Sequence, residues 1–123
     1  MLKSILTELN DEYFDGKVKV NEIRWMKKKL LKVFGRCDLT KKVIEINSIL
    51  RSNPRVLKFV VMHELCHLAD KRHKKGRKHH TKAFWERFKK YPNFEAENRL
   101  YHLFIGNYWV NSGYMKKEDL RGN

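Results

Sequence analysis

The sequence is poor in cysteine, proline and glycine, with 2, 2 and 6 of these residues among 123. The two cysteines, Cys37 and Cys66, are too few for a disulfide scaffold or for a zinc ribbon. No stretch approaches the roughly 18 uncharged apolar residues that a membrane span requires. Residues 1–10 also lack the apolar core and the cleavage site of a signal peptide. We therefore expect a cytoplasmic or nucleoid-associated protein with no membrane partner.

Basic residues outnumber acidic ones two to one. Lysine and arginine contribute 28 residues against 14 aspartates and glutamates, which gives a formal net charge of +14 at pH 7. A charge this large increases self-repulsion and usually reflects a polyanionic partner, most often a nucleic acid. The hydrophobic fraction of 41% is nonetheless too high for a disordered chain. We expect a single domain over residues 1–114 and a polar tail over residues 115–123.

Hydrophobic periodicity and turn residues predict an α+β fold. Apolar residues recur at helical spacing over residues 2–14, and an Asp-Gly turn ends that pattern. A small, about three-stranded sheet is expected from three β-rich runs, EIRW (22–25), LLKVFGRCDL (30–39) and KVIEIN (42–47). Three helices should follow: a central one over 54–69, one from Thr81 to Pro92, and one that Asn93 caps and Gly106 ends.

The central helix carries the strongest chemical signal. Asn53 should cap it, with Pro54 at its first position. Its segment VVMHELCHLAD is apolar on almost every side except at His63, Glu64 and His67, and buried imidazoles and carboxylates are costly unless paired or metal-bound. A spacing of four residues places the two histidines about 40° apart around the helix axis, so both can bind one ion. Zinc lowers the pKa of a bound water to about 7, and the adjacent glutamate can take that proton.

A catalytic zinc site needs a third protein ligand, and spacing alone leaves several candidates open. They are His73, His79, His80, His102, Glu95 and Glu97. The alternative to any metal site is a core helix whose two histidines are satisfied by hydrogen bonds.

An ordered set of segments resembles the SprT-like family of zinc metallopeptidases, which includes Spartan-type proteases of DNA–protein crosslinks. The segments are ELNDEYFDGKV, EIRW, GRCDLTKKVIEINSIL, VVMHELCHLAD and HTKAFW, and YPNFEAENRL also resembles the related YgjP-like metallopeptidases. This resemblance covers about residues 5–91 and implies a zincin-like minimal domain that binds one Zn²⁺ per chain. It implies that His80 is the third ligand, just outside a helix that Thr81 caps. His79 is the alternative, because a one-residue slip is easy in such a loop.

Other polar residues near the motif have weaker assignments. Asp70 could orient a ligand imidazole, although a surface position near the helix end is the commoner role. Cys66 is expected to be a small buried side chain. Cys37 should border the cleft, where a zinc-blocking thiolate is a minor alternative. Four residues could donate to the substrate carbonyl, although core packing is the favoured role for each: Tyr101, His102, Tyr108 and Trp109.

Two lysine-rich segments frame the expected site. KRHKKGRKHH joins His67 to His80, and MKKKLLK precedes the strand that should border the cleft. Such clusters neutralise phosphates without reading sequence, and tryptophans stack on unpaired bases, although Trp85 is expected in the core. The residues expected to contact nucleic acid, with single-stranded DNA favoured, are Lys71, Arg72, Lys74, Lys75, Arg77, Lys78, Lys27, Lys28 and Lys29, with Lys32 beside them. The alternative is a pair of solvated loops.

These observations predict a zinc endopeptidase that acts on proteins bound to nucleic acid, with Glu64 as its general base. One alternative is a nucleic-acid-binding module in which zinc is structural and catalysis is absent. Another is a zinc peptidase that acts independently of DNA, whose charge serves solubility or acidic protein substrates.

Overall fold

The computed structural model describes residues 1–70 and 80–119. In chain order its elements are α1 (Leu2–Phe14), β1 (Glu22–Trp25), β2 (Gly35–Asp38), β3 (Val43–Ile46), the 3₁₀ helix η1 (Ser48–Ser52), α2 (Pro54–Ala69), α3 (Lys82–Phe88), α4 (Phe94–Asn111) and the 3₁₀ helix η2 (Lys117–Asp119). The expected α+β class is confirmed. None of the described helices combines the length and the apolar composition needed to cross a bilayer.

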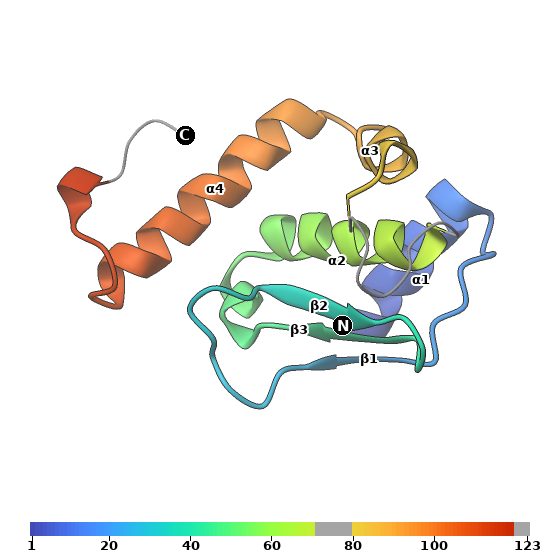
Figure 1. Ribbon diagram of the computed structural model, residues 1–123, viewed down its shortest axis with the longest axis horizontal. Helices are drawn as coiled ribbons and strands as arrows, with labels where there is room; N and C mark the ends of the chain where they lie inside the picture. Colours follow the sequence, from blue (N-terminus) through green and yellow to red (C-terminus); the bar gives the residue numbers. More distant parts are fainter. Residues whose placement is uncertain (71–79, 120–123) are drawn as a thin grey trace.

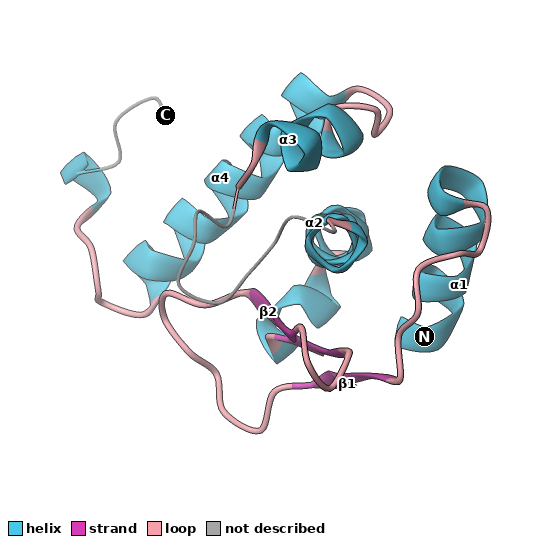
Figure 2. Ribbon diagram, turned by 45° about the vertical axis from the view of Figure 1, so that its right-hand side comes forward, coloured by secondary structure: helices cyan, strands magenta, loops and turns pink. Residues whose placement is uncertain are grey.

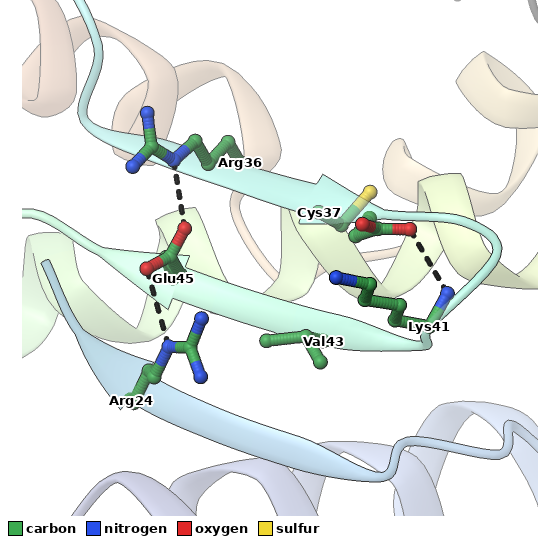
Figure 3. A pocket seen from close by; sticks show the side chains of 7 residues that line it. Arg24, Arg36, Cys37, Lys41, Val43 and Glu45 are labelled. Atoms are coloured by element: carbon green, nitrogen blue, oxygen red, sulfur yellow. Dashed lines mark hydrogen bonds and ion pairs between the residues drawn. The ribbon is translucent and has the colours of Figure 1, made fainter.

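The sheet has the order β1-β3-β2, with β1 parallel and β2 antiparallel to the central strand. Along β3, Ile44 and Ile46 are fully buried, whereas Glu45 lies on the opposite, solvated face. There Glu45 accepts from Arg24 of β1 at 3.2 Å and from Arg36 of β2 at 2.9 Å (Figure 3). The two faces therefore differ in polarity, and the apolar one is available for helix packing.

Helix α2 lies at the centre of the molecule. It contacts the sheet through β2 and β3, and α1, α3 and α4 pack around it (Figures 1 and 2). Its start is the expected one, because the Asn53 side chain accepts a hydrogen bond from the Val56 amide at 3.2 Å and Pro54 occupies the first position. A helix with neighbours on most sides must be apolar around most of its circumference, which explains why Lys58, His63, Glu64 and His67 are the main interruptions of the hydrophobic run.

The expectation that a strand begins near residue 30 is wrong, since β2 begins at Gly35. The side chain of Asn47 holds residues 30–34 in a loop instead. Its Nδ2 group donates to the carbonyls of Leu30 at 2.8 Å and Val33 at 3.0 Å, and its Oδ1 accepts from the Ile49 amide at 3.2 Å. A fully buried amide thus replaces the ladder hydrogen bonds that a strand would have made.

Helix α4 does not end at Gly106 as expected, but continues through Tyr108 and Trp109. Both aromatic side chains reach the same loop, since the Tyr108 hydroxyl donates to the Leu30 carbonyl at 3.4 Å and Trp109 Nε1 donates to the Leu31 carbonyl at 2.6 Å. These contacts stabilise helix beyond a glycine that costs about 1 kcal/mol relative to alanine.

The start of α4 also differs in detail from the prediction. Asn93 occupies the N-cap position, but its backbone has a φ of 55° and its side chain makes no capping hydrogen bond. The left-handed backbone, which asparagine tolerates better than most residues, redirects the chain after Pro92. Helix α3 is shorter than expected and ends at Phe88.

Replacing Asn47 with alanine should destabilise the fold by about 2–3 kcal/mol, because it removes the donors of two loop carbonyls and leaves a void in the core. Urea unfolding of both proteins measures the difference. Asn21→Ala is the matched control, because Asn21 is exposed and donates to a single carbonyl, that of Lys41. We expect the control to lose less than about 1 kcal/mol. Equal losses in the two variants would contradict the anchoring role of Asn47.

Candidate metal centre

Three histidines converge beside the C-terminal half of α2. His63 and His67 lie one turn apart on that helix, and His80 immediately precedes Thr81, the N-cap of α3. The Nε2 atoms of His63 and His67 are 3.1 Å apart, and one ligand nitrogen from each of the three rings lies within 4.8 Å of the others. Within residues 1–70 and 80–119, this is the group of metal-ligating side chains that is close enough to hold one ion.

The donor set fits zinc. In a tetrahedral site with Zn–N bonds of about 2.0–2.1 Å, two ligand nitrogens lie about 3.3–3.4 Å apart. The observed 3.1 Å between His63 and His67 is close to that edge, and a ligand nitrogen of the exposed His80 lies within 4.8 Å of both. Three imidazoles with an open fourth position are also the ligand set of known catalytic zinc sites.

Phe84 supports all three imidazole rings. Its ring is fully buried and its centroid lies 5.1 Å from that of His63, 4.4 Å from that of His67 and 4.9 Å from that of His80. Stacking and edge contacts of this kind restrict how the imidazoles rotate. The short helix α3 therefore contributes to the geometry of a site whose first two histidines belong to α2.

The environment keeps His63 in the form that binds metals. Burial, together with the charge of nearby His80, lowers the pKa of His63 to about 4. The ring is consequently neutral at pH 7, so a nitrogen lone pair is available to an ion without first losing a proton.

Glu64 lies beside the histidines and is buried, with 5% of its surface exposed. Burial raises its pKa to about 8, while a hydrogen bond from the Cys37 thiol acts in the opposite direction. The same pair has the reverse effect on the thiol, since burial and the Glu64 carboxylate raise the pKa of Cys37 to about 12. In the metal-free protein Cys37 is therefore a protonated donor to Glu64, and it does not belong to the histidine group that could hold an ion.

Gly35 allows β2 to approach this carboxylate, a role that sequence reasoning missed. A Cβ atom at Gly35 would lie 2.8 Å from Val60 Cγ1 and 3.0 Å from Glu64 Oε2. No side chain fits in that space, so strand and helix can pack this closely only at a glycine. The available signal was a glycine at the centre of a β-rich run, LLKVFGRCDL.

Whereas His67 is buried, His63, His80 and Glu64 line a cleft of about 400 Å³. Its walls come from the loop before β2 and from α2, α3 and α4; they are Lys32, Val33, Phe34, Gly35, Phe59, Val60, His63, Glu64, His80, Trp85, Phe88, Asn98, Tyr101 and His102. Of the four carbonyl-donor candidates, Tyr101 and His102 line this cleft, whereas Tyr108 and Trp109 bind the loop carbonyls described above.

Several sequence predictions are refined by these positions. The placement of Trp85 in the core is wrong: the residue is 39% exposed and lines the cleft, while neighbouring Phe84 is the buried one. Cys66 is fully buried, as expected. Among the other candidate ligands, Glu97 pairs with Arg55 at 2.8 Å instead.

The remaining candidates fall into two groups. Glu95 and His102 are exposed on α4 and do not belong to the histidine group. The other candidate ligands and the cations between α2 and α3 lie outside the described residues; they are Lys71, Arg72, His73, Lys74, Lys75, Arg77, Lys78 and His79.

A second hollow, of about 390 Å³, lies on the solvated face of the sheet (Figure 3). Its cationic side chains include Arg24 and Arg36, and both guanidinium groups pair with Glu45. These ion pairs are exposed to water and salt, so they contribute little to stability. The hollow offers no group of metal ligands among its described residues, so the chemistry concentrates in the cleft beside α2.

The raised pKa of Glu64 predicts the pH response of the metal-free protein. An unfolded chain releases this proton near pH 4.5, whereas the folded protein holds it to about pH 8, so Glu64 lowers stability as pH rises between these values. With zinc chelated, Glu64→Gln should therefore be more stable than the parent by about 2–4 kcal/mol near pH 7.5, and the difference should vanish near pH 4.5.

Urea unfolding at both pH values tests this expectation. Glu86→Gln, which changes an exposed glutamate of α3, is the control and should leave the free energy of unfolding nearly unchanged. If the parent is at least as stable as Glu64→Gln near pH 7.5, the pKa of Glu64 is not raised in the folded protein.

Comparison with known proteins agrees with the resemblance. The model of the SprT-like family matches residues 2–102, which is most of the chain. Searches of curated proteins and of solved structures each gave no significant match. The SprT-like family is generally a family of zinc metallopeptidases, and its match covers α1, the sheet, α2, α3 and the first half of α4. On the extent of this match, the chain belongs to the SprT-like family.

Proposed function

We propose that the protein is a zinc-dependent endopeptidase whose ligands are His63, His67 and His80 and whose general base is Glu64. The observation that carries this proposal is the convergence of three imidazoles, within 4.8 Å of one another, beside a buried glutamate at an open cleft. Neutral imidazoles and an adjacent carboxylate are the groups that hydrolysis of a peptide bond assisted by zinc requires.

Zinc, when bound, supplies Lewis acidity that polarises the scissile carbonyl and lowers the pKa of the attacking water. Glu64 takes the water's proton on its carboxylate and passes it to the leaving amine. Burial raises the pKa of Glu64 and so favours its protonated form, which is the form that donates a proton to the leaving amine. A nearby divalent cation would favour the ionised form, which is the form that accepts the proton from water. The Cys37 thiol orients this carboxylate by donating to it.

The proposed substrate is a protein bound to nucleic acid, with single-stranded DNA as the favoured nucleic acid. Support comes from the net charge of +14 and from the loop of residues 26–34, which carries Lys27, Lys28 and Lys29 on the way to the cleft. Lys32 of that loop lines the cleft, as does the exposed ring of Trp85. A cationic rim beside an exposed indole suits phosphates and unpaired bases.

One zinc per chain should co-purify with the protein, and His63→Ala should lose it.

Glu64→Gln should retain zinc yet hydrolyse a peptide about 10²–10⁴-fold more slowly, because an amide cannot accept the water's proton. Metal analysis and peptide turnover measure these effects, with Glu86→Gln as the matched control that keeps both. Stoichiometric zinc in His63→Ala would end the metal assignment, whereas equal turnover in Glu64→Gln would remove Glu64 as the base.

The nucleic-acid part of the proposal has a separate test. Replacing Lys27, Lys28 and Lys29 with alanine should weaken binding of single-stranded DNA and lower the slope of its salt dependence by about 0.7 for each phosphate that is no longer neutralised. Cleavage of a DNA-bound protein should slow, while zinc content and hydrolysis of a free peptide should stay unchanged. Replacing Lys74, Lys75, Arg77 and Lys78 together should act in the same direction.

The matched control removes three exposed lysines elsewhere, Lys3, Lys17 and Lys19, and should have little effect on DNA affinity. If the loop variants and this control lose DNA affinity equally, binding depends on the total positive charge of the protein. The lysines beside the cleft would then not form a specific binding site for nucleic acid. Proteolysis that is indifferent to DNA in the parent would favour the DNA-independent peptidase. DNA binding without any proteolysis would favour the binding module with a structural zinc.

A further inference from the structure

The two chain segments that supply the histidines are joined by a side-chain contact. Asp70 ends α2, three residues after His67, and Thr81 begins α3, one residue after His80. The Thr81 hydroxyl donates to Asp70 Oδ2 at 2.5 Å. The two side chains are eleven residues apart in the sequence. Their contact therefore links the end of α2, near His67, to the start of α3, next to His80.

Thr81 has a second bond that continues this connection. Its Oγ1 atom also accepts from the backbone amide of Phe84 at 3.1 Å and so caps α3. Phe84 is the ring that contacts all three imidazoles. One hydroxyl therefore joins the end of α2, the position of His80 and the aromatic support of the site.

The location of Asp70 requires hydrogen bonds to its carboxylate. It is buried, with 5% of its surface exposed, and it lies at the C-terminus of a helix, where the dipole disfavours a negative charge. Burying a carboxylate there is costly unless its hydrogen bonds compensate. A short hydrogen bond from a hydroxyl to a carboxylate is stronger than one between neutral groups, and it also restricts the orientation of both side chains.

We propose that Asp70 and Thr81 are positioning residues, a clasp that holds His80 and Phe84 in register with His63 and His67 for metal binding. This inference rests on the proposed zinc site and adds to it residues that are not ligands. Without the clasp, His80 would be held less firmly beside α2. Metal binding would then have to order its position, and the lost conformational entropy would lower the affinity for the metal.

The test measures the zinc dissociation constant of the full chain by competition with a chromophoric chelator. Asp70→Ala breaks the clasp and leaves the Thr81 cap in place, Thr81→Val removes both, and Thr81→Ser keeps both. We expect zinc affinity to fall by about tenfold or more in the first two variants and to stay within about twofold of the parent in the third. The double variant Asp70→Ala, Thr81→Val should lose little more than Thr81→Val alone, because the clasp is already broken in that single variant.

A second readout separates positioning from general stability. The visible absorption of the Co²⁺-loaded protein reports the number and geometry of ligands, and it should change in Asp70→Ala but not in Thr81→Ser. Asn53→Ala is the matched control, because it removes an equivalent cap from the remote end of α2 and should lower stability without changing zinc affinity or the cobalt spectrum.

Unchanged zinc affinity and an unchanged cobalt spectrum in both clasp variants would overturn the inference and leave the contact a purely structural one. If Asp70→Ala does not fold, Asp70→Asn replaces it, since its neutral amide oxygen should give a smaller loss of affinity; no loss would again overturn the clasp. Full zinc affinity in His80→Ala would overturn it too, without removing His63 and His67 as ligands. A parent that binds no zinc would instead reject the proposed function itself.

Discussion

The burial of Glu64 within α2 is the constraint on which the rest of the structure depends. An isolated carboxylate in a protein core is costly in its ionised form, and the fold responds by raising its pKa to about 8. The elements in contact with Glu64 must then accommodate a polar group where an apolar one would pack better. Strand β2 is the element whose contacts with the carboxyl group show this accommodation.

Strand β2 shows how this constraint extends to another element. Two positions on the same face of the strand meet Glu64: Gly35, where a Cβ atom would clash, and Cys37, whose thiol donates to the carboxylate. A larger residue at the first position would separate strand from helix, and a residue without a donor at the second would leave the carboxylate with one hydrogen bond fewer. Local β propensity would favour other residues at both places, so the site determines the strand's sequence as much as the fold does.

The features that could be predicted from the sequence are those set by local pattern. The apolar run with Asn53 and Pro54 predicts α2, and the spacing of His63 and His67 places two imidazoles together, because both depend on helix geometry alone. The features that could not be predicted depend on tertiary contacts. Asn47 converts an apparent strand into a loop, and the exposure of Trp85 follows from how α3 packs.

The clasp between Asp70 and Thr81 was beyond prediction for the same reason. The sequence identifies Thr81 as a helix cap and leaves Asp70 without a clear role, since nothing in the pattern indicates that the two residues meet. The placement of His80 came from the resemblance to the SprT-like family, and its approach to His63 and His67 is visible only in three dimensions. Long-range side-chain bonds of this kind have no periodic signature.

Local charge explains how so basic a chain can present a site suited to a dication. Charges further away than about 8–10 Å are largely screened in physiological salt, so the net charge of +14 matters less than the groups around the three imidazoles. Burial keeps His63 neutral, and two buried acidic residues lie near the histidines of α2: Glu64 between them and Asp70 just after the helix. The lysines at positions 27–29 are exposed on a loop, where water and salt weaken their repulsion of an ion. The exposed lysines at positions 27–29 are therefore screened more strongly than the buried groups around the histidines.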